Sequence, residues 1–543
     1  MTALRPSTVL IGQVLVAARA DRVETAEAIG IADGRVVMVG RADEVRAAAA
    51  RKARTIHAGS AAVVPGMHDF HLHLVGMARA RRDVALDGAS GFAELLSRVH
   101  SAARRSGAGE WLRGGGWSEA VMQSGDPGLL REVCAGHPCI FYSHDCHSAW
   151  ASPMALSAAG IFADTPHPPG GRIERDTTGL ATGILRERAA DLIEGVAGRL
   201  SGPPLEVALH EVLSELAGLG ITGATDAGDT TASNGVGEHA FLGDRASRLL
   251  AAGNRLDGKL RLTVNLPVEA IDAAAALGWR TGMTLPGTQT VRLGWAKAYA
   301  DGALGSRTAA VFTPYPDGGG HGILRLDPLA LDEIMRRGRA AGIGLAVHAI
   351  GDRAVTMSLD ALLRAPARAA DAPSDRLEHL QLVRPSDIER LAAQDVTASM
   401  QPMHAASDRG LVDGLWGASE SMAYPWRSIA AAGGRLAFGS DAPIESANPW
   451  HGLFAAVHRR FPGDDTLDWR PEEAVTPARA LAAYTLGPAQ AIGRSAEGHL
   501  RAGALADLAI LNVDLATLLT ADERLADVRA DLTLVGGREV HRS

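Results

Sequence analysis

Two histidines, His71 and His73, stand two residues apart in the stretch PGMHDFHLHLVG (65–76). If this stretch is a β-strand, both imidazole rings project from one face, because successive side chains of a strand point to opposite sides. Imidazole is the commonest metal ligand in proteins, so a pair at this spacing could hold a cation. A chance pair is the alternative interpretation, since the chain contains nineteen histidines.

Further potential ligands lie in other apolar stretches of the chain. Taken alone, each has an ordinary explanation as a hydrogen-bonded core histidine or as a carboxylate that caps a helix. They form a metal site only if one fold brings these stretches together. They are Lys297 in LGWAKAYADG (293–302), His348 in GIGLAVHAIG (342–351), His379 in RLEHLQLV (376–383) and Asp441 in RLAFGSDAPIE (435–445).

Lys297 is the least expected member of this set. The chain contains only three lysines, Lys52, Lys259 and Lys297. A free ammonium group is costly to bury in an apolar strand. An ion pair with a nearby carboxylate such as Asp301 would offset that cost. Alternatively, the deprotonated amine is carboxylated by CO₂, and the resulting carbamate bridges two cations.

The potential ligands require a fold that gathers the ends of several strands. Eight β-like segments recur with helical segments between them, which is typical of a parallel sheet. We therefore expect an α/β protein with a (β/α)₈ TIM-type barrel, whose catalytic groups lie at the carboxyl ends of the strands. All the potential ligands fall at such ends. The eight segments are 61–74, 220–228, 259–266, 291–302, 342–351, 376–383, 396–404 and 435–445.

The two ends of the chain differ from its middle. Residues 1–60 and 491–543 are rich in β patterns, including a hairpin signal at Asp33-Gly34, and we expect one small β-sandwich domain built from both chain ends. Residues 61–490 are assigned to the barrel. A long insertion, at about 75–215, follows the first strand. Its pattern predicts no fold apart from one helix near its end, where leucines recur at helical spacing.

Composition narrows the range of functions. The net charge is −8 and the 54 Lys and Arg residues are scattered, so neither nucleic acid nor an anionic membrane is an expected partner. No apolar run reaches the roughly 18 residues of a membrane span, and the first ten residues lack the pattern of a signal peptide. We expect a cytoplasmic protein that acts on a small molecule, as a monomer or a homodimer.

A cluster of cysteines and histidines raises the question of a second metal site. This cluster could bind zinc, but it lacks the C-x-x-C spacing of structural zinc sites, and small buried thiols are common. An odd number of cysteines in a cytosolic protein also argues against a disulfide framework. The residues are Cys134, Cys139, Cys146, His137, His144 and His147.

Ten motifs occur in order along the chain: PGMHDFHLHL (65–74), WLRGGGW (111–117), DCHSAW (145–150), GGRIERDTTGLATGIL (170–185), KAYADGALGSRTA (297–309), HAIGDRAV (348–355), EHLQLV (378–383), QPMHAASD (401–408), GSDAPIE (439–445) and GALADLAIL (503–511). Together they resemble the metal-dependent amidohydrolase superfamily, in the YtcJ-like branch that includes N-substituted formamide deformylases. The resemblance implies the barrel and the two-ended β domain. Lys297 falls where related binuclear members have a carboxylated lysine. The metal ligands that the resemblance implies are His71, His73, His348, His379 and Asp441.

We predict a hydrolase of carbon–nitrogen bonds other than peptide bonds. Two divalent cations, with zinc favoured, would lower the pKa of water towards about 7 and polarise the acyl group of an N-formyl, N-acyl or carbamate substrate. Asp441 would be both ligand and proton shuttle, and Asp69 would orient an imidazole. The residues predicted to contact the substrate are His147, Trp150, Arg307 and His404.

Three other functions stay open at this point. A deaminase of the same superfamily would use one metal, but Lys297 argues against it because a mononuclear site needs no bridge. A non-catalytic binding protein on the same barrel would have no need of a full ligand set. A phosphoesterase would be expected to carry more basic groups around the site.

Overall fold

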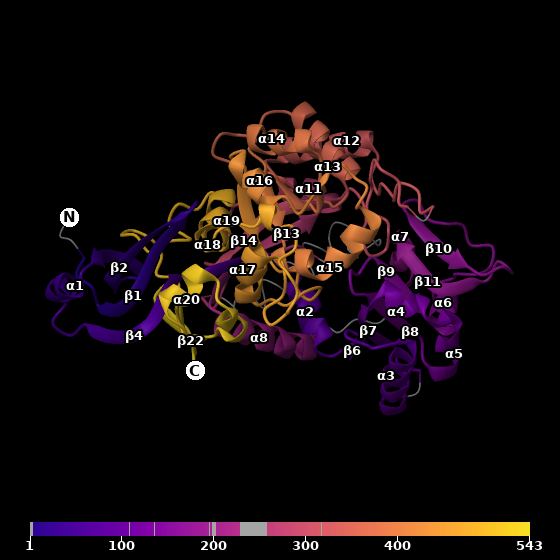
Figure 1. Cartoon of the computed structure of the whole chain (residues 1–543), viewed down its shortest axis with the longest axis horizontal. Coiled ribbons are helices and arrows are strands. Elements are labelled where there is room, and N and C mark those ends of the chain that lie inside the picture. The colour runs from indigo at the N-terminus through magenta and orange to yellow at the C-terminus, as the bar shows by residue number, and fades with distance from the viewer. Residues whose placement is uncertain are drawn as a thin grey trace.

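The computed structural model of the chain describes residues 4–107, 109–134, 136–194, 196–197, 202–228, 258–316 and 318–543. An eight-stranded parallel sheet forms the centre of the molecule (Figure 1). A seven-stranded sheet from both chain ends lies on one side of it, and an insertion with a six-stranded sheet lies on the other. The predicted α/β barrel fold, with a two-ended β unit and an insertion after the first strand, is confirmed.

The central sheet is a nearly closed barrel. Each predicted segment overlaps one of its strands, and all neighbouring strands are parallel. The first and last strands meet where Asp441 N donates to His71 O over 2.6 Å. In spatial order the strands are β20 (Arg435–Phe438), β18 (Thr397–Met400), β16 (Arg376–His379), β15 (Leu345–Ala349), β14 (Val291–Tyr299), β13 (Arg261–Pro267), β12 (Ile221–Asp226) and β5 (Met67–Leu72).

Helices cover the outside of the barrel, and local sequence signals set their ends. In α12, Asp327 Oδ1 accepts from Ala330 N at 2.8 Å, Pro328 occupies the first turn, and Gly342 ends the helix at φ 67°. The leucine-rich helix predicted near residue 205 is α8. The barrel helices are α8 (Gly202–Gly218), α11 (Ile271–Ala276), α12 (Pro328–Ala341), α13 (Asp352–Arg364), α14 (Pro385–Ala393), α15 (Pro402–Leu415), α16 (Trp426–Ala431), α17 (Pro449–His458), α18 (Pro477–Tyr484) and α19 (Leu486–Ala491).

The seven-stranded sheet combines both chain ends. The predicted hairpin is present, with Asp33 and Gly34 at φ 48° and 73°, as a tight turn between antiparallel strands requires. Val36 N in β3 donates to Ala504 O at 2.9 Å, so the edge strand from the N-terminal part contacts the loop before β21 of the C-terminal part. Its elements are β1 (Thr8–Arg19), β2 (Arg22–Ala32), β3 (Arg35–Gly40), α1 (Ala42–Ala48), β4 (Arg54–Pro65), β21 (Leu508–Leu511), α20 (Leu515–Thr520), β22 (Ala530–Val535) and β23 (Arg538–Arg542).

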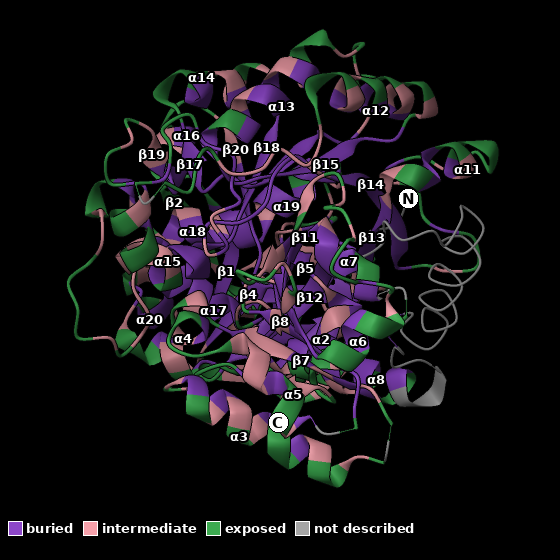
Figure 2. Ribbon diagram, turned by 90° about the vertical axis from the view of Figure 1, so that its right-hand side faces the viewer, coloured by how far each residue is buried: buried purple, intermediate pink, exposed green. Residues whose placement is uncertain are grey.

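The insertion has a sheet and a hydrophobic core of its own, which sequence patterns did not predict. Trp117, Phe141 and Trp150 are fully buried in that core. Helix α3 of the insertion lies at the lower edge of Figure 2 and shows exposed and intermediate residues there. Its elements are α2 (Leu74–Ala80), β6 (Val84–Ala85), α3 (Phe92–Arg105), β7 (Leu112–Trp117), α4 (Glu119–Gln123), α5 (Leu130–Val133), β8 (Cys139–Ser143), β9 (Ser148–Ala151), α6 (Pro153–Ala158), β10 (Gly171–Arg175), β11 (Ala181–Glu187) and α7 (Arg188–Glu194).

Short elements complete the described chain. A two-stranded pair, β17 (Leu382–Val383) and β19 (Met422–Ala423), lies outside the barrel. None of the described helices combines the length and the apolar composition that crossing a bilayer would need. The 3₁₀ turns are Pro127–Leu129, Val268–Ala270, Pro471–Glu473 and Glu523–Asp527.

Candidate metal centre

Five imidazole rings form a continuous row at the carboxyl ends of the barrel strands. Ring centroids are 5.6 Å apart between His73 and His71, 5.0 Å between His71 and His379, and 4.6 Å between His379 and His348. His147 of the insertion continues the series at 5.1 Å from His348. We call these five residues the imidazole row. The barrel therefore brings all four histidines predicted as metal ligands together.

Asp441 lies against one end of the row. Its Oδ1 is 3.1 Å from His73 Nε2 and 3.4 Å from His71 Nε2. One ligand atom each of His71, His379 and Asp441 lie within 4.8 Å of one another, which is close enough to hold one ion. Asp441 Oδ1 is buried yet makes no hydrogen bond of good geometry with the described residues. A cation between these groups would satisfy that oxygen.

The two histidines of the first strand are each held by a second protein group. His71 Nδ1 donates to Glu378 Oε2 at 2.6 Å, and His73 Nδ1 donates to Gly228 O. In both rings Nε2 is therefore the nitrogen that is left for a metal, which is the usual arrangement of metal-binding imidazoles. Sequence reasoning missed Glu378. Its signal was an Arg376–Glu378 pair at i, i+2 in the strand that ends at His379, and both side chains are fully buried.

In His379 and His348, too, a second protein group occupies one ring nitrogen and leaves the other for a metal. His379 Nδ1 donates to Gln401 Oε1 at 2.8 Å, which leaves Nε2 for a metal. His348 Nε2 donates to Gly302 O at 3.1 Å, which leaves Nδ1. Second contacts of this kind fix both the tautomer and the ring orientation. All four predicted imidazole ligands are thus oriented by the protein itself.

Burial sets the charge of these groups. Desolvation lowers the pKa of His71 to about 4 and lowers those of His348 and His379 well below the usual value, so the rings are neutral, as ligands must be. Burial alone would raise the pKa of Asp441, but its contacts with the imidazoles of His71, His73 and His379 outweigh burial and hold this pKa well below the usual value. Asp441 is accordingly ionised.

Lys297 lies in β14 beside the row. Its Nζ is 5.1 Å from the centroid of the Tyr299 ring. The ion pair with Asp301 that the sequence left open is not formed, because Asp301 instead accepts from the backbone N–H groups of Ile350 and Gly351 at 3.0 and 2.8 Å. Burial lowers the pKa of Lys297 to about 8, so an appreciable fraction of its amine is unprotonated near neutral pH.

The backbone brings β5 and β20 unusually close at the site. Asp69 Oδ1 accepts from His71 N at 3.2 Å and from Ser440 N at 3.0 Å. The sequence predicted that Asp69 orients an imidazole, but these contacts show that it positions the backbone. A Cβ atom at Gly439 would lie 2.4 Å from His71 N, so only glycine permits this approach. Asp441 itself is left-handed, at φ 61°, a strained conformation of the kind found at functional sites.

Two of the four predicted substrate contacts lie at the row. His147 belongs to it, and the ring of His404 stacks on that of His379 at 6.0 Å with its Nε2 3.7 Å from Asp441 Oδ2. Trp150 does not reach the row: it is buried in the insertion core, where its Nε1 donates to Pro127 O at 2.9 Å. Packing explains the position of Trp150, and its contact with the substrate stays a prediction.

Arg307 and the two cysteines Cys134 and Cys139 are not members of the row. Arg307 is half-buried in the loop after β14, where its charge lowers the pKa of Tyr315 against the effect of burial. Cys134 and Cys139 are buried in the insertion core. Within the described ranges, the only group of three or more potential metal ligands within 4.8 Å of one another is His71, His379 and Asp441, so the cysteines form no second site there.

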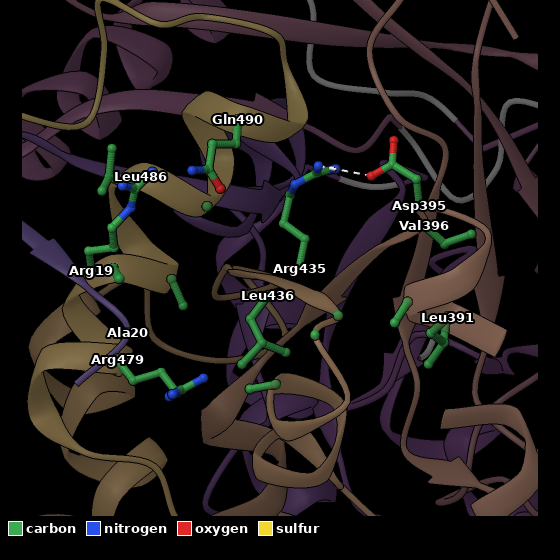
Figure 3. A pocket seen from close by; sticks show the side chains of 17 residues that line it. Arg19, Ala20, Leu391, Asp395, Val396, Arg435, Leu436, Arg479, Leu486 and Gln490 are labelled. Carbon is green, nitrogen blue, oxygen red and sulfur yellow. Dashed lines mark hydrogen bonds and ion pairs between the residues drawn. The ribbon is translucent and has the colours of Figure 1, made fainter. Parts of the chain in front are cut away.

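A separate surface pocket of about 300 Å³ lies at the opposite, amino end of the barrel strands, near the start of β20 (Figure 3). Arg435 Nη2 donates to Asp395 at 2.9 Å on its wall, and Arg479 Nη2 donates to Asp21 at 2.8 Å. Two of its three arginines are therefore already neutralised. Barrels of this kind have their active sites at the carboxyl ends of the strands, so the imidazole row and not this pocket is the candidate site.

A barrel with imidazoles, a carboxylate and a lysine at its strand ends has the architecture of a metal-dependent hydrolase. The model of the family described as "Amidohydrolase family" matches residues 54–541. The chain belongs to this amidohydrolase family.

Similar proteins agree with that assignment. The chain is 30% identical over 515 residues to N-substituted formamide deformylase of Arthrobacter pascens, covering 92% of each chain. It is 28% identical over 539 residues to the putative amidohydrolase YtcJ of Bacillus subtilis, covering 95% of this chain and 96% of that one. An uncharacterized metal-dependent hydrolase from Pyrococcus furiosus has a crystal structure with a TM-score of 0.68 at 26% identity, covering 92% and 97% of the two chains. Together they support a hydrolase role that depends on a divalent metal.

Proposed function

We propose that the protein is a zinc-dependent amidohydrolase that cleaves the carbon–nitrogen bond of a small N-formyl, N-acyl or carbamate compound. One observation carries the proposal: each of the four barrel imidazoles has one nitrogen occupied by a second protein group and the other left for a ligand. A histidine that only fills a core has no need of this pattern.

The donor set supports two ions. His71, His73 and Asp441 would hold one, and His348 and His379 would hold the other. A carbamate on Lys297 would bridge them, and the lowered pKa of this amine favours its carboxylation. Imidazole nitrogens and carboxylate oxygens are suitable ligands for zinc. When bound, such ions lower the pKa of water to about 7 and polarise a substrate carbonyl.

Asp441 is the proton carrier in this proposal. Its ionised carboxylate accepts a proton from the attacking water and delivers it to the leaving nitrogen, because an amine leaves poorly as an anion. The water thus adds across the bond: its oxygen goes to the acyl carbon and its two protons end on the carboxyl and amine products. His73 holds the carboxylate in place through the 3.1 Å contact of Nε2 with Oδ1.

A deaminase with one metal is the second candidate. It is favoured by the grouping of His71, His379 and Asp441, whose ligand atoms lie within 4.8 Å and would be enough for a single ion. Lys297 distinguishes the two proposals, since a mononuclear centre gives a bridging lysine nothing to do.

A substrate panel tests the proposal. Zinc-loaded protein would be incubated with N-formyl, N-acyl and carbamate compounds and with ring amidines, and the release of acid, amine and ammonia would be measured. N-substituted formamides come first, because a relative at 30% identity carries that activity in its name. Release of acid and amine supports the amidohydrolase, and ammonia from ring amidines alone supports the deaminase. No turnover of any compound by the metal-loaded protein would contradict both.

A further inference from the structure

The far end of the imidazole row belongs to the insertion and not to the barrel. His147 lies in the loop between β8 and β9, and its buried ring is 5.1 Å from that of His348. We propose that His147, held by Glu187, hydrogen-bonds the acyl oxygen of the substrate, so that the substrate lies along the row with its leaving nitrogen at Asp441. This inference rests on the proposed function; to the substrate contact predicted at His147 it adds the atom that is bound and the partner Glu187, which sequence motifs did not reveal.

Glu187 fixes the orientation of the His147 ring. The Nδ1 atom of His147 lies 3.0 and 3.2 Å from the two carboxylate oxygens of Glu187. The backbone repeats this pairing, because Glu187 N donates to His147 O at 2.8 Å. The Glu187 side chain is fully buried. A carboxylate in this position leaves His147 Nε2 as the nitrogen that can contact a ligand.

Barrel residues hold Glu187 from the other side. Arg325 Nη1 donates to Glu187 Oε2 at 3.2 Å, and Thr308 Oγ1 donates to Glu187 Oε1. Glu187 is left-handed, at φ 51°, a conformation that costs a non-glycine residue energy and persists only where surrounding contacts enforce it. The His147–Glu187 pair is thus fixed in the joint between the insertion and the barrel.

The two ends of the row offer different chemistry to a substrate. Asp441 contacts His71 and His73 at one end and is a carboxylate, which suits a leaving nitrogen that gains a proton. At the other end, His147 forms an ion pair with the Glu187 carboxylate through Nδ1, and in this ion pair the protonated ring carries a second N–H, at Nε2, that can donate to an oxygen acceptor. An amide substrate has this polarity, with its nitrogen and its carbonyl oxygen on opposite sides of the acyl carbon.

Formate binding tests this orientation without turnover, because formate carries the same oxygens as the acyl product. Calorimetry would measure its dissociation constant for full-length zinc-loaded protein, with each affinity compared at equal zinc content. His147→Ala should weaken formate binding roughly tenfold or more, as the loss of a hydrogen bond to a charged group does. His147→Gln, which keeps a donor, should retain part of the affinity, and Glu187→Gln should weaken it by a smaller factor than His147→Ala.

A matched control comes from the same loop. His144→Ala removes an imidazole that pairs with Glu445 at 3.5 Å outside the row, and it should bind formate like the wild type. If His147→Ala binds formate as tightly as the wild type, or loses affinity only in proportion to lost zinc, the proposal is overturned. If the wild type hydrolyses no amide but formate affinity still depends on His147, the proposed function fails and the binding role of His147 stands.

Discussion

The Asp441 end and the His147 end of the imidazole row are built in different ways. At the first, β5 and β20 of the same barrel are joined directly, with Asp441 N donating to His71 O over 2.6 Å. At the second, His147 reaches the row from the insertion, and Glu187 connects it to Thr308 and Arg325 in the barrel loop between β14 and α12. The difference teaches that the proposed metal ligands all come from the barrel, whereas the proposed substrate contact at His147 comes from the insertion and its docking.

Loss of Lys297 should have the largest effect, because its carbamate would serve both halves of the centre. Lys297→Ala should lose bound zinc and turnover, and a short carboxylic acid such as acetate should restore part of the turnover. Lys297→Arg keeps the charge but cannot be carboxylated in the same way, so it should fail as badly. Elemental analysis and kinetic assays measure both effects. If Lys297→Arg behaves like the wild type, Lys297 contributes only its positive charge, and the proposed binuclear centre is wrong.

Asp441→Asn should break the chemistry of the first end while the second end still binds substrate. Loss of general acid–base help should reduce kcat by roughly 10²- to 10⁴-fold, and lost metal would add to this. The change in KM should be smaller, because His147 is untouched. Steady-state kinetics at measured zinc occupancy is the test. Retention of most of the kcat at full occupancy would remove Asp441 from the mechanism.

Two glutamates allow a direct comparison between the ends. Glu378→Gln weakens the carboxylate that orients His71, so zinc affinity should fall about 10- to 100-fold. Glu187→Gln acts at the end outside the proposed ligand set and should leave zinc affinity unchanged. Competition with a chelator measures both. Thermal unfolding must accompany the first variant, because Glu378 also pairs with the fully buried Arg376. Equal loss of zinc from both variants would contradict the proposal that the Asp441 end binds metal and the His147 end binds only substrate.

The smallest effect is expected at the rim of the joint. His144 of the insertion is 45% exposed in its side chain and lies 3.5 Å from Glu445 of the barrel. An ion pair this exposed contributes less than about 1 kcal/mol, so His144→Ala should change the free energy of unfolding little and leave zinc content and turnover intact. Denaturant unfolding checks the first statement. A large loss of turnover would show that the docking of the insertion depends on this pair.

Sequence patterns were most informative where structure is local. Each barrel strand is a short apolar segment between helices, and the parallel arrangement then places His71, Lys297, His348, His379 and Asp441 at one rim. That inference needed no knowledge of side-chain contacts. The helix near Leu205 and the Asp33-Gly34 turn were predictable for the same reason.

The remainder depends on contacts between distant segments. Glu187 lies 40 residues after His147 and 138 residues before Arg325 in the sequence. No short sequence pattern predicts that these three residues are in contact. Trp150 shares a motif with His147, but the two residues lie in different environments: His147 in a loop that faces the barrel, and Trp150 in a strand of the insertion core. Asp69 was given an imidazole to orient, when its partners are backbone N–H groups.

The position of zinc in crystals of the metal-loaded protein tests the central claim most directly. Anomalous diffraction at the zinc edge should give two peaks at the barrel rim. One is expected between His71, His73 and Asp441, and the other beside His348 and His379, with density for a carbamate on Lys297 between them. A single peak would contradict the binuclear centre. No peak at the imidazole row in zinc-saturated crystals would contradict the account as a whole.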